Sequence, residues 1–130
     1  MKRLAILFLF VGLISCNSQD KKETSFVDVN VEEFRKGIQK EGIQLVDVRM
    51  PKEFKAGHIK GATLINFFDE SFKEVSTKKL NKNQPVYLYC RSGGTPAKAA
   101  KMYTNAGFKK VYTLLGGVNA WSASGQEIHQ

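Results

Sequence analysis

Residues 86–96, VYLYCRSGGTP, carry the clearest structural signal in this chain of 130 residues. The first four of them are rich in β-branched and aromatic side chains and predict a buried strand. Pro96 suits the first position of a helix, where a missing N–H costs little, and Thr95 suits the N-cap before it. We therefore expect a strand, a tight loop and a helix, with Cys90 at the carboxyl end of the strand.

The same alternation of strand and helix signals extends along the rest of the chain. Apolar runs predict strands at 26–29, 45–48, 63–65, 85–89 and 111–114, and helical patterns separate or follow them at 31–38, 51–56, 69–80, 96–106 and 116–123. Strands separated by helices predict βαβ units, and hence an α/β fold with a mostly parallel five-stranded sheet and helices on both faces. Ligands of such folds bind beyond the carboxyl ends of the strands, where Cys90 is expected.

The loop after Cys90 predicts a site for a nucleophile that becomes anionic, or for a bound oxyanion. Gly93 and Gly94 allow successive N–H groups to point inward and form an anion-binding nest. These donors and the positive end of the following helix predict a lowered pKa for the Cys90 thiol, and Arg91 adds charge if its side chain turns inward. The alternative is a cysteine buried as a small apolar residue, which explains neither the glycines nor the cap.

Two classes of enzyme use such a loop. Protein-tyrosine phosphatases need the pattern Cys-x5-Arg, in which the arginine clamps the phosphate through two hydrogen bonds. The sixth residue after Cys90 is Pro96, which offers neither a side-chain nor a backbone N–H donor. Phosphate-ester hydrolysis is therefore disfavoured. Rhodaneses use a six-residue loop, and residues 90–95 resemble one.

The resemblance to the rhodanese-like family extends over nearly the whole domain. Its three signatures are similar, in order, to LVDVR at 45–49 with EF at 53–54 and GHIKGA at 57–62, to VYLYCRSG at 86–93, and to LGGVNAW at 115–121. Many single-domain members carry arginine where this chain has Thr95 and serine where it has Pro96, so this loop holds one cation fewer. Threonine at the sixth place does occur in thiosulfate- and mercaptopyruvate-type loops.

This resemblance implies a rhodanese-like three-layer fold and a sulfurtransferase that needs no metal or organic cofactor. Cys90 would attack the outer sulfur of a small, thiosulfate-like donor, become a persulfide, and pass the sulfur to cyanide or a thiol. The residues implied to bind the substrate and the persulfide are those of the loop: Arg91, Ser92, Gly93, Gly94 and Thr95.

Two other functions stay open. A non-catalytic rhodanese-like module would bind a partner protein or a small anion at the same loop, although inactive versions can dispense with the thiol that this chain keeps. Thiol–disulfide exchange would need a resolving cysteine in a Cys-x-x-Cys pair, which Cys90 lacks.

Other polar residues near the motifs favour structural roles. Asp47 and Arg49 flank the end of a predicted strand, and Glu53 follows within a helical turn. We interpret these three as an ion-pair network that braces the site, with direct catalysis as the alternative. His58 lies in a turn between two glycines and has no second ligand at metal-binding spacing. Trp121 is expected to fill the core.

The first 25 residues differ in kind from the rest. A basic start and an apolar run at 4–14 predict a secretory signal at 1–15, with a packed core helix as the alternative. Residues 13–16, LISC, resemble the lipobox of bacterial lipoproteins, which implies lipidation of Cys16; an ordinary signal with an incidental cysteine is the alternative. The polar stretch 16–25 is then a lipidated flexible tether, and 26–130 is one rhodanese-like domain.

These assignments predict an exported bacterial lipoprotein that faces the periplasm. Asn17 follows Cys16 where aspartate would favour retention at the inner membrane, so an outer-membrane location is expected. With Cys16 acylated, Cys90 has no partner for an intramolecular disulfide. A lone thiol in an oxidising compartment is a liability unless it has a function.

The chain is basic, with a net charge of +8 that falls to +6 without Lys2 and Arg3. This charge is typical of a solvated lysine-rich surface, and it also favours anionic small substrates or phospholipid headgroups. The lysines are scattered along the sequence and accompany no nucleic-acid motif, so no nucleic acid is expected. The expected partners are a small sulfur donor, a thiol or cyanide acceptor, and a membrane reached through Cys16, with the protein itself a monomer.

Overall fold

The computed structural model describes residues 25–130, and the predicted signal at 1–15, Cys16 and the tether up to residue 24 lie outside the described residues. The elements are β1 (Val27–Val29), α1 (Val31–Ile38), β2 (Gln44–Asp47), α2 (Pro51–Ala56), β3 (Thr63–Leu64), α3 (Phe72–Lys79), β4 (Val86–Tyr89), α4 (Thr95–Asn105), β5 (Val111–Leu114) and α5 (Gly117–Ala123). No helix within 25–130 is long and apolar enough to cross a membrane.

The five strands form one sheet in the order β1-β5-β4-β2-β3, and all four pairings are parallel. The predicted α/β fold with a five-stranded parallel sheet is therefore confirmed. Strand β4 lies at the centre of the sheet, which explains why its sequence gives the strongest strand signal. Because all strands run the same way, their carboxyl ends meet at one edge of the sheet and their amino ends at the other.

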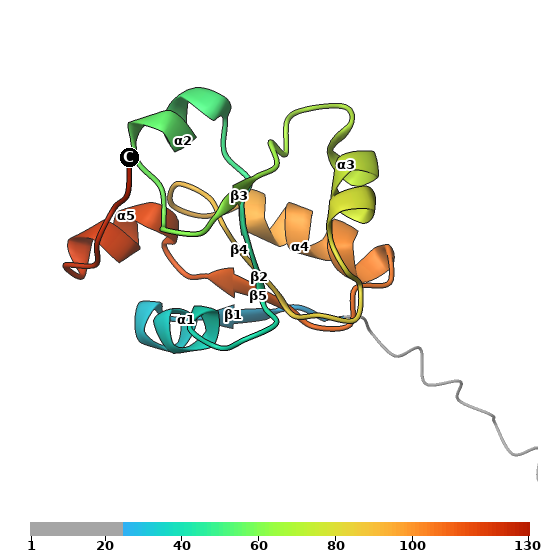
Figure 1. The fold of residues 1–130 in the computed structure, drawn as a ribbon, viewed down its shortest axis with the longest axis horizontal. Coiled ribbons are helices and arrows are strands. Elements are labelled where there is room, and N and C mark those ends of the chain that lie inside the picture. The colour runs from blue at the N-terminus through green and yellow to red at the C-terminus, as the bar shows by residue number, and fades with distance from the viewer. Residues whose placement is uncertain (1–24) are drawn as a thin grey trace, which may run out of the picture.

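Helices cover both faces of the sheet, as Figure 1 shows. Alternate residues of β4 supply the two cores, because successive side chains of a strand point to opposite faces. Val86 and Leu88 join the core under α3 and α4, whereas Tyr87 and Tyr89 join the core under α1 and α5. The ring of Phe34 in α1 packs edge-on against Tyr87, Tyr89 and Trp121, so Trp121 fills the core as expected.

Local signals account for where two helices begin. Helix α1 starts with a capping box, in which the Asn30 side chain accepts from the Glu33 N–H at 2.9 Å and Glu33 reaches back to the Asn30 N–H. Helix α3 begins at Phe72 rather than at the predicted Asp69. The Asp69 carboxylate accepts hydrogen bonds from the backbone N–H and the hydroxyl of Ser71, which holds residues 69–71 in a turn instead.

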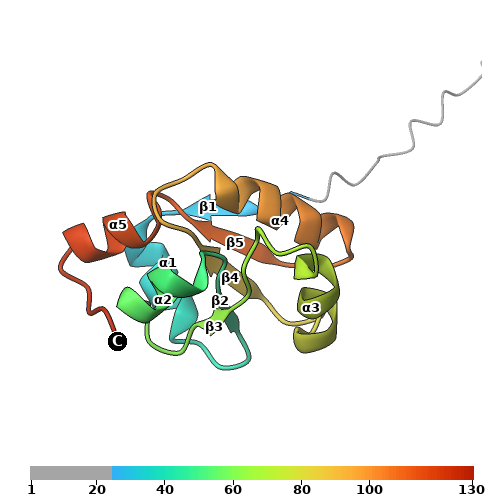
Figure 2. The same cartoon turned by 90° about the horizontal axis from the view of Figure 1, so that it is seen from above.

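The C-terminal segment lies against α2 and the turn after it (Figure 2). His58 and His129 form an isolated antiparallel bridge, with N–H···O distances of 2.9 and 2.8 Å. The His58 ring also stacks on Phe54 at a centroid distance of 3.8 Å, and its Nδ1 lies 2.9 Å from the Phe54 carbonyl oxygen. These contacts agree with the structural interpretation of His58.

The start of α5 packs directly on the loop that follows β4. The N–H groups of Val118 and Asn119 donate to the carbonyls of Cys90 and Arg91 at 2.8 and 3.0 Å. Gly117 has φ of +59°, and a Cβ atom there would lie 2.5 Å from both of these carbonyl oxygens. Only glycine permits this approach, so the third sequence signature fixes the position of the Cys90 loop.

Replacing Gly117 by alanine is expected to lower the free energy of unfolding by about 2–4 kcal/mol, from left-handed strain and the backbone clash together. The matched control is Gly125→Ala, since Gly125 also has a positive φ, of +81°, but open space around it. That variant should lose only about 1 kcal/mol. Urea denaturation measures both, and equal losses would show that the close approach at Gly117 contributes nothing.

Candidate active site

Cys90 follows the central strand at its carboxyl end and lines a cavity of about 600 Å³. The residue is 5% exposed, and its Sγ lies 3.8 Å from the Gly93 carbonyl oxygen. Seven of the nine residues that the sequence singled out in and around this loop line the cavity: Cys90, Arg91, Ser92, Gly93, Thr95, Arg49 and Glu53. Gly94 and Asp47 do not line it.

The loop curls through two glycines with positive φ, 150° at Gly93 and 80° at Gly94. Gly94 occupies the N-cap of α4, and Thr95 is the first helical residue. The prediction that Thr95 is the N-cap is therefore wrong, because the turn at the glycines starts the helix one residue earlier. Thr95 is half-buried and faces the cavity from the first turn of α4.

The electrostatic setting of Cys90 differs from the predicted one. Burial raises the pKa of the thiol above its ordinary value, which outweighs the backbone N–H groups of Ser92 and Gly93 and the charge of Arg49, all of which lower it. The expected lowering of the Cys90 pKa is thus wrong for the free protein. The backbone cradle is present, but the cost of removing a thiolate from water is larger.

Arg91 does not turn inward towards the thiol. Its Nε and Nη2 atoms both lie 2.8 Å from Oε1 of Glu53 on α2, across 38 residues of sequence. Burial alone would raise the pKa of Glu53, yet hydrogen bonds from Arg91 and from the Met50 N–H hold it below its usual value. The positive charge of Arg91 is therefore paired at the rim of the cavity, where its side chain is 67% exposed.

Asp47 and Arg49 form a buried ion pair beside the site. Nη2 of Arg49 donates to Asp47 Oδ2 at 2.7 Å, its Nε donates to both carboxylate oxygens, and the Arg49 N–H also donates to Oδ1. The same Nη2 donates to the Gly57 carbonyl at 2.6 Å. The guanidinium lies 5.6 Å from the centre of the Tyr89 ring, whose hydroxyl accepts from the Ile59 N–H at 3.0 Å.

This pair connects the ends of β2 and β4 to the segment after α2. Asp47 lies outside the cavity, while Arg49 spans from its wall to the Gly57 carbonyl. The arrangement favours the structural interpretation of Asp47 and Arg49. Glu53 is joined to the active-site loop instead, through Arg91. The three residues thus brace the site from two directions rather than as one network.

Sequence reasoning missed the apolar rim of the cavity. Met50 and Phe68 line it and are 48% and 61% exposed. Phe68 precedes α3, and Met50 precedes α2, so neither falls on a helical or strand period that would mark it. A single exposed apolar residue carries no signal in a sequence, because many such residues occur on ordinary surfaces.

The raised pKa of Cys90 predicts how its reactivity depends on pH. Because the thiolate is the nucleophile, alkylation by iodoacetamide should accelerate with rising pH until the thiol is fully ionised. The rate for Cys90 is expected to reach half of its plateau only above about pH 8.5, the pH at which a free cysteine peptide is half ionised. A midpoint below that pH would show that the loop donors outweigh burial after all.

A cysteine at the end of a central parallel strand, held in a glycine-rich loop that opens into a helix, defines a class of α/β proteins with a backbone cradle around a thiol. The chain belongs to the rhodanese-like domain family, which matches residues 30–124.

Named relatives cover most of the chain. The uncharacterized protein YqhL of Bacillus subtilis is 32% identical over 123 residues, which span 93% of this chain and 94% of that protein. The thiosulfate sulfurtransferase GlpE of Tolumonas auensis is 26% identical over 75% of this chain and 90% of its own length. Among solved structures, the polysulfide-sulfur transferase of Wolinella succinogenes, a homodimer, aligns with a TM-score of 0.68 at 27% identity, over 80% of this chain and 78% of that one.

Proposed function

We propose that this protein is a sulfurtransferase that carries sulfane sulfur as a persulfide on Cys90. The observation that carries the proposal is the position of the thiol, which lines an open cavity and has the backbone N–H groups of Ser92 and Gly93 near enough to lower its pKa. Backbone donors aimed at one atom stabilise the negative charge of a thiolate or of a terminal persulfide sulfur. The sulfurtransferase names of GlpE and of the Wolinella protein support the same activity class.

The reaction has two balanced steps. The Cys90 thiolate attacks the outer sulfur of a thiosulfate-like donor, an S–S bond forms, and the S–S bond of the donor breaks as sulfite leaves with the electron pair. Cyanide or a thiolate then attacks the terminal sulfur of the persulfide, and the Cys90 thiolate leaves. Neither step requires an external oxidant, a metal or an organic cofactor.

Because the pKa of Cys90 is raised by burial, the thiol must lose its proton to water or buffer before it attacks the donor. A dianionic donor in the cavity would not promote this ionisation, because a like charge nearby disfavours the thiolate. The free thiol is then protected from oxidation between turnovers. Protonated cysteine reacts slowly, whereas low-pKa exposed thiolates are the ones that oxidants attack.

A second candidate, a non-catalytic module that binds a partner protein, is favoured by the exposed apolar side chains of Met50 and Phe68 beside the cavity. Exposed apolar groups around a pocket are typical of sites that contact another molecule. In this case Cys90 would only line the pocket, and no sulfur would be transferred.

Mass spectrometry of the intact protein separates the two candidates. After incubation with thiosulfate and removal of the excess, the sulfurtransferase is expected to gain the mass of one sulfur atom, and dithiothreitol should remove it. A binding module would gain no covalent mass. No gain with thiosulfate, mercaptopyruvate or an organic persulfide as donor would refute the proposed activity.

We further propose that the protein is an exported lipoprotein, anchored by a lipid on Cys16 with its domain in the periplasm. Support comes from the order of basic, apolar and lipobox residues at 1–16. Two or more acyl chains hold a protein stably on a membrane. Radiolabelled fatty acid should mark the protein but not the Cys16→Ser variant, and equal labelling of both would refute the anchor.

A further inference from the structure

Lysines that are far apart in the sequence come together at the end of the sheet where the parallel strands begin. We call this end the amino edge, and the opposite end, which carries Cys90, the carboxyl edge. On the amino edge, three loops precede β2, β4 and β5, at 39–43, 80–85 and 106–110. Hydrogen bonds join them: Gln44 with Asn81 in both directions, Lys109 N–H to the Lys82 carbonyl, and Val86 N–H to the Lys110 carbonyl. These loops and the last residue of α3 carry five exposed lysines, which we call the basic edge: Lys40, Lys79, Lys82, Lys109 and Lys110.

The basic edge has little negative charge to balance it. Glu41 is the acidic residue within these three loops. The loops at the carboxyl edge, at 48–50, 65–71, 90–94 and 115–116, carry two arginines and two acids and have no net charge. The loops at the amino edge are therefore more positive than the loops around Cys90, although Lys52 and Lys55 of α2 also lie at the Cys90 end.

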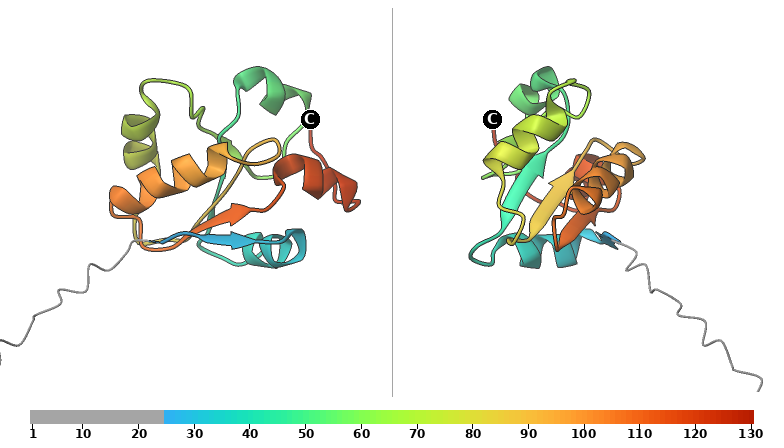
Figure 3. Two further views of the ribbon diagram at one scale, coloured as in Figure 1. Left: turned by 180° about the vertical axis from the view of Figure 1, so that it is seen from behind. Right: turned by 90° about the vertical axis from the view of Figure 1, so that its right-hand side faces the viewer.

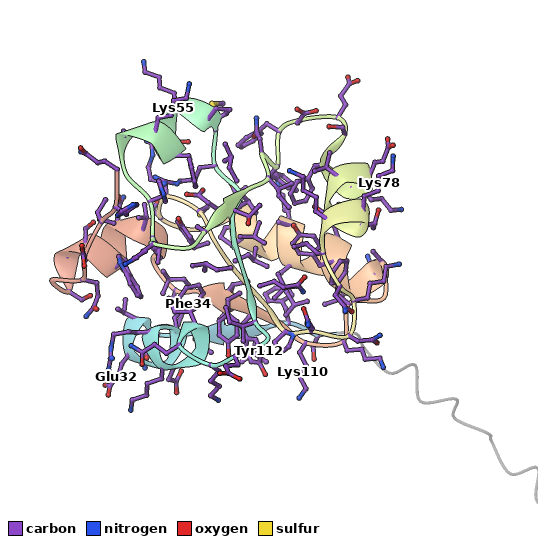
Figure 4. The ribbon with its side chains drawn as sticks, in the orientation of Figure 1. Glu32, Phe34, Lys55, Lys78, Lys110 and Tyr112 are labelled. Atoms are coloured by element: carbon purple, nitrogen blue, oxygen red, sulfur yellow. The ribbon has the colours of Figure 1, made fainter. Side chains whose placement is uncertain are left out.

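The chain enters the domain at this same edge. Strand β1 runs parallel to β5 with Val27 opposite Tyr112, so Ser25 lies near the level of Lys110. Figure 3 shows the start of β1 beside the turn between α4 and β5. Figure 4 shows Lys110 near this point, and Lys55 on α2 at the other end of the molecule. The described part of the chain therefore begins at the basic edge.

We propose that the basic edge rests on an anionic phospholipid surface and thereby directs the Cys90 cavity away from the membrane. The proposal rests on the proposed lipid anchor. The eight residues between Cys16 and Ser25 reach at most about 28 Å when fully extended. A domain of this size is about 30 Å across, so the tether keeps the amino edge nearer to the bilayer than the carboxyl edge. Clustered lysines near a membrane are attracted by anionic lipids.

Lysine labelling on vesicles tests this orientation. The full-length lipoprotein is reconstituted in vesicles of phosphatidylcholine, with or without phosphatidylglycerol, and treated briefly with an amine-reactive reagent before peptide mass spectrometry. Labelling of Lys82, Lys109 and Lys110 is expected to slow about fivefold on the anionic vesicles relative to the neutral ones. Labelling of Lys52 and Lys55 on α2 should not change. High salt should abolish the difference, because it screens exposed charges.

Paired charge reversals give the matched control. The double variant Lys109→Glu with Lys110→Glu is expected to lose the protection of Lys82 and Lys40, whereas Lys52→Glu with Lys55→Glu should keep it. Both pairs are exposed, so neither is expected to disturb folding.

The outcomes distinguish this proposal from the others. If the protein floats with both kinds of vesicle but its lysines are labelled equally on both, the proposed orientation is wrong and the lipid anchor is not affected. The basic edge would then be a candidate surface for an acidic macromolecule. Protection of Lys52 and Lys55 would also overturn it. Failure to float with either vesicle would refute the anchor and the orientation together. Sulfur transfer by Cys90 is measured separately, and its result does not depend on these vesicle experiments.

Discussion

Replacing Cys90 by serine is expected to lower thiosulfate:cyanide sulfurtransferase activity by more than about a thousandfold. A serine hydroxyl remains protonated at any pH the protein survives, and oxygen cannot carry sulfur as a persulfide. The substitution is nearly isosteric, and the site offers an acceptor in the Gly93 carbonyl, to which the Cys90 Sγ already points. The fold should therefore be retained, with a denaturation midpoint close to that of the natural chain.

The control for this variant is Cys16→Ser. It removes the other of the two cysteines in the sequence, and the purified protein should keep its full activity in detergent. Activity retained in Cys90→Ser would place the nucleophile elsewhere, and activity lost equally in both variants would show that the loss is not specific to Cys90.

Replacing Asp47 by alanine is expected to lower the free energy of unfolding by about 3–5 kcal/mol. The carboxylate is fully buried and accepts three hydrogen bonds from the side chain of Arg49, which is itself 7% exposed. Its removal leaves a buried guanidinium with the Gly57 carbonyl as its remaining acceptor. Urea denaturation measures the loss.

Two controls show whether the loss comes from the unpaired charge. Glu32→Ala removes one partner of an exposed ion pair with Lys36, and no measurable change in stability is expected. The double variant Asp47→Leu with Arg49→Met removes both buried charges and should recover much of the stability lost in Asp47→Ala. If the double variant is no more stable than Asp47→Ala, the loss reflects packing rather than an uncompensated charge.

The sequence was sufficient for the parallel α/β fold because local and global signals agree in this chain. Apolar runs, the capping box at Asn30 and the glycines that end helices all favour the observed order of elements. Both errors concern the residue at which a helix begins, where short polar side chains or glycines form a turn in place of the expected first helical residues or cap. Asp69 and Ser71 form a turn where helix was expected, and Gly94 takes the cap position expected for Thr95.

The electrostatics of the site were less predictable. Position in a glycine-rich loop indicates which donors face Cys90, but not how much water the fold removes from the thiol. The direction of the Arg91 side chain depends on Glu53, 38 residues away, and on how α2 lies over the loop. The basic edge depends in the same way on tertiary structure, because its lysines come from three separate loops and the end of α3.

The most direct test of the central claim is a single turnover of sulfur at Cys90. Protein treated with a donor and freed of its excess is divided, and one half is digested while the other receives cyanide. We predict that the added sulfur lies on the peptide containing Cys90, and that cyanide yields one thiocyanate for each sulfur carried and restores the free thiol. Added sulfur on another residue, or a persulfide that cyanide does not discharge, would contradict it.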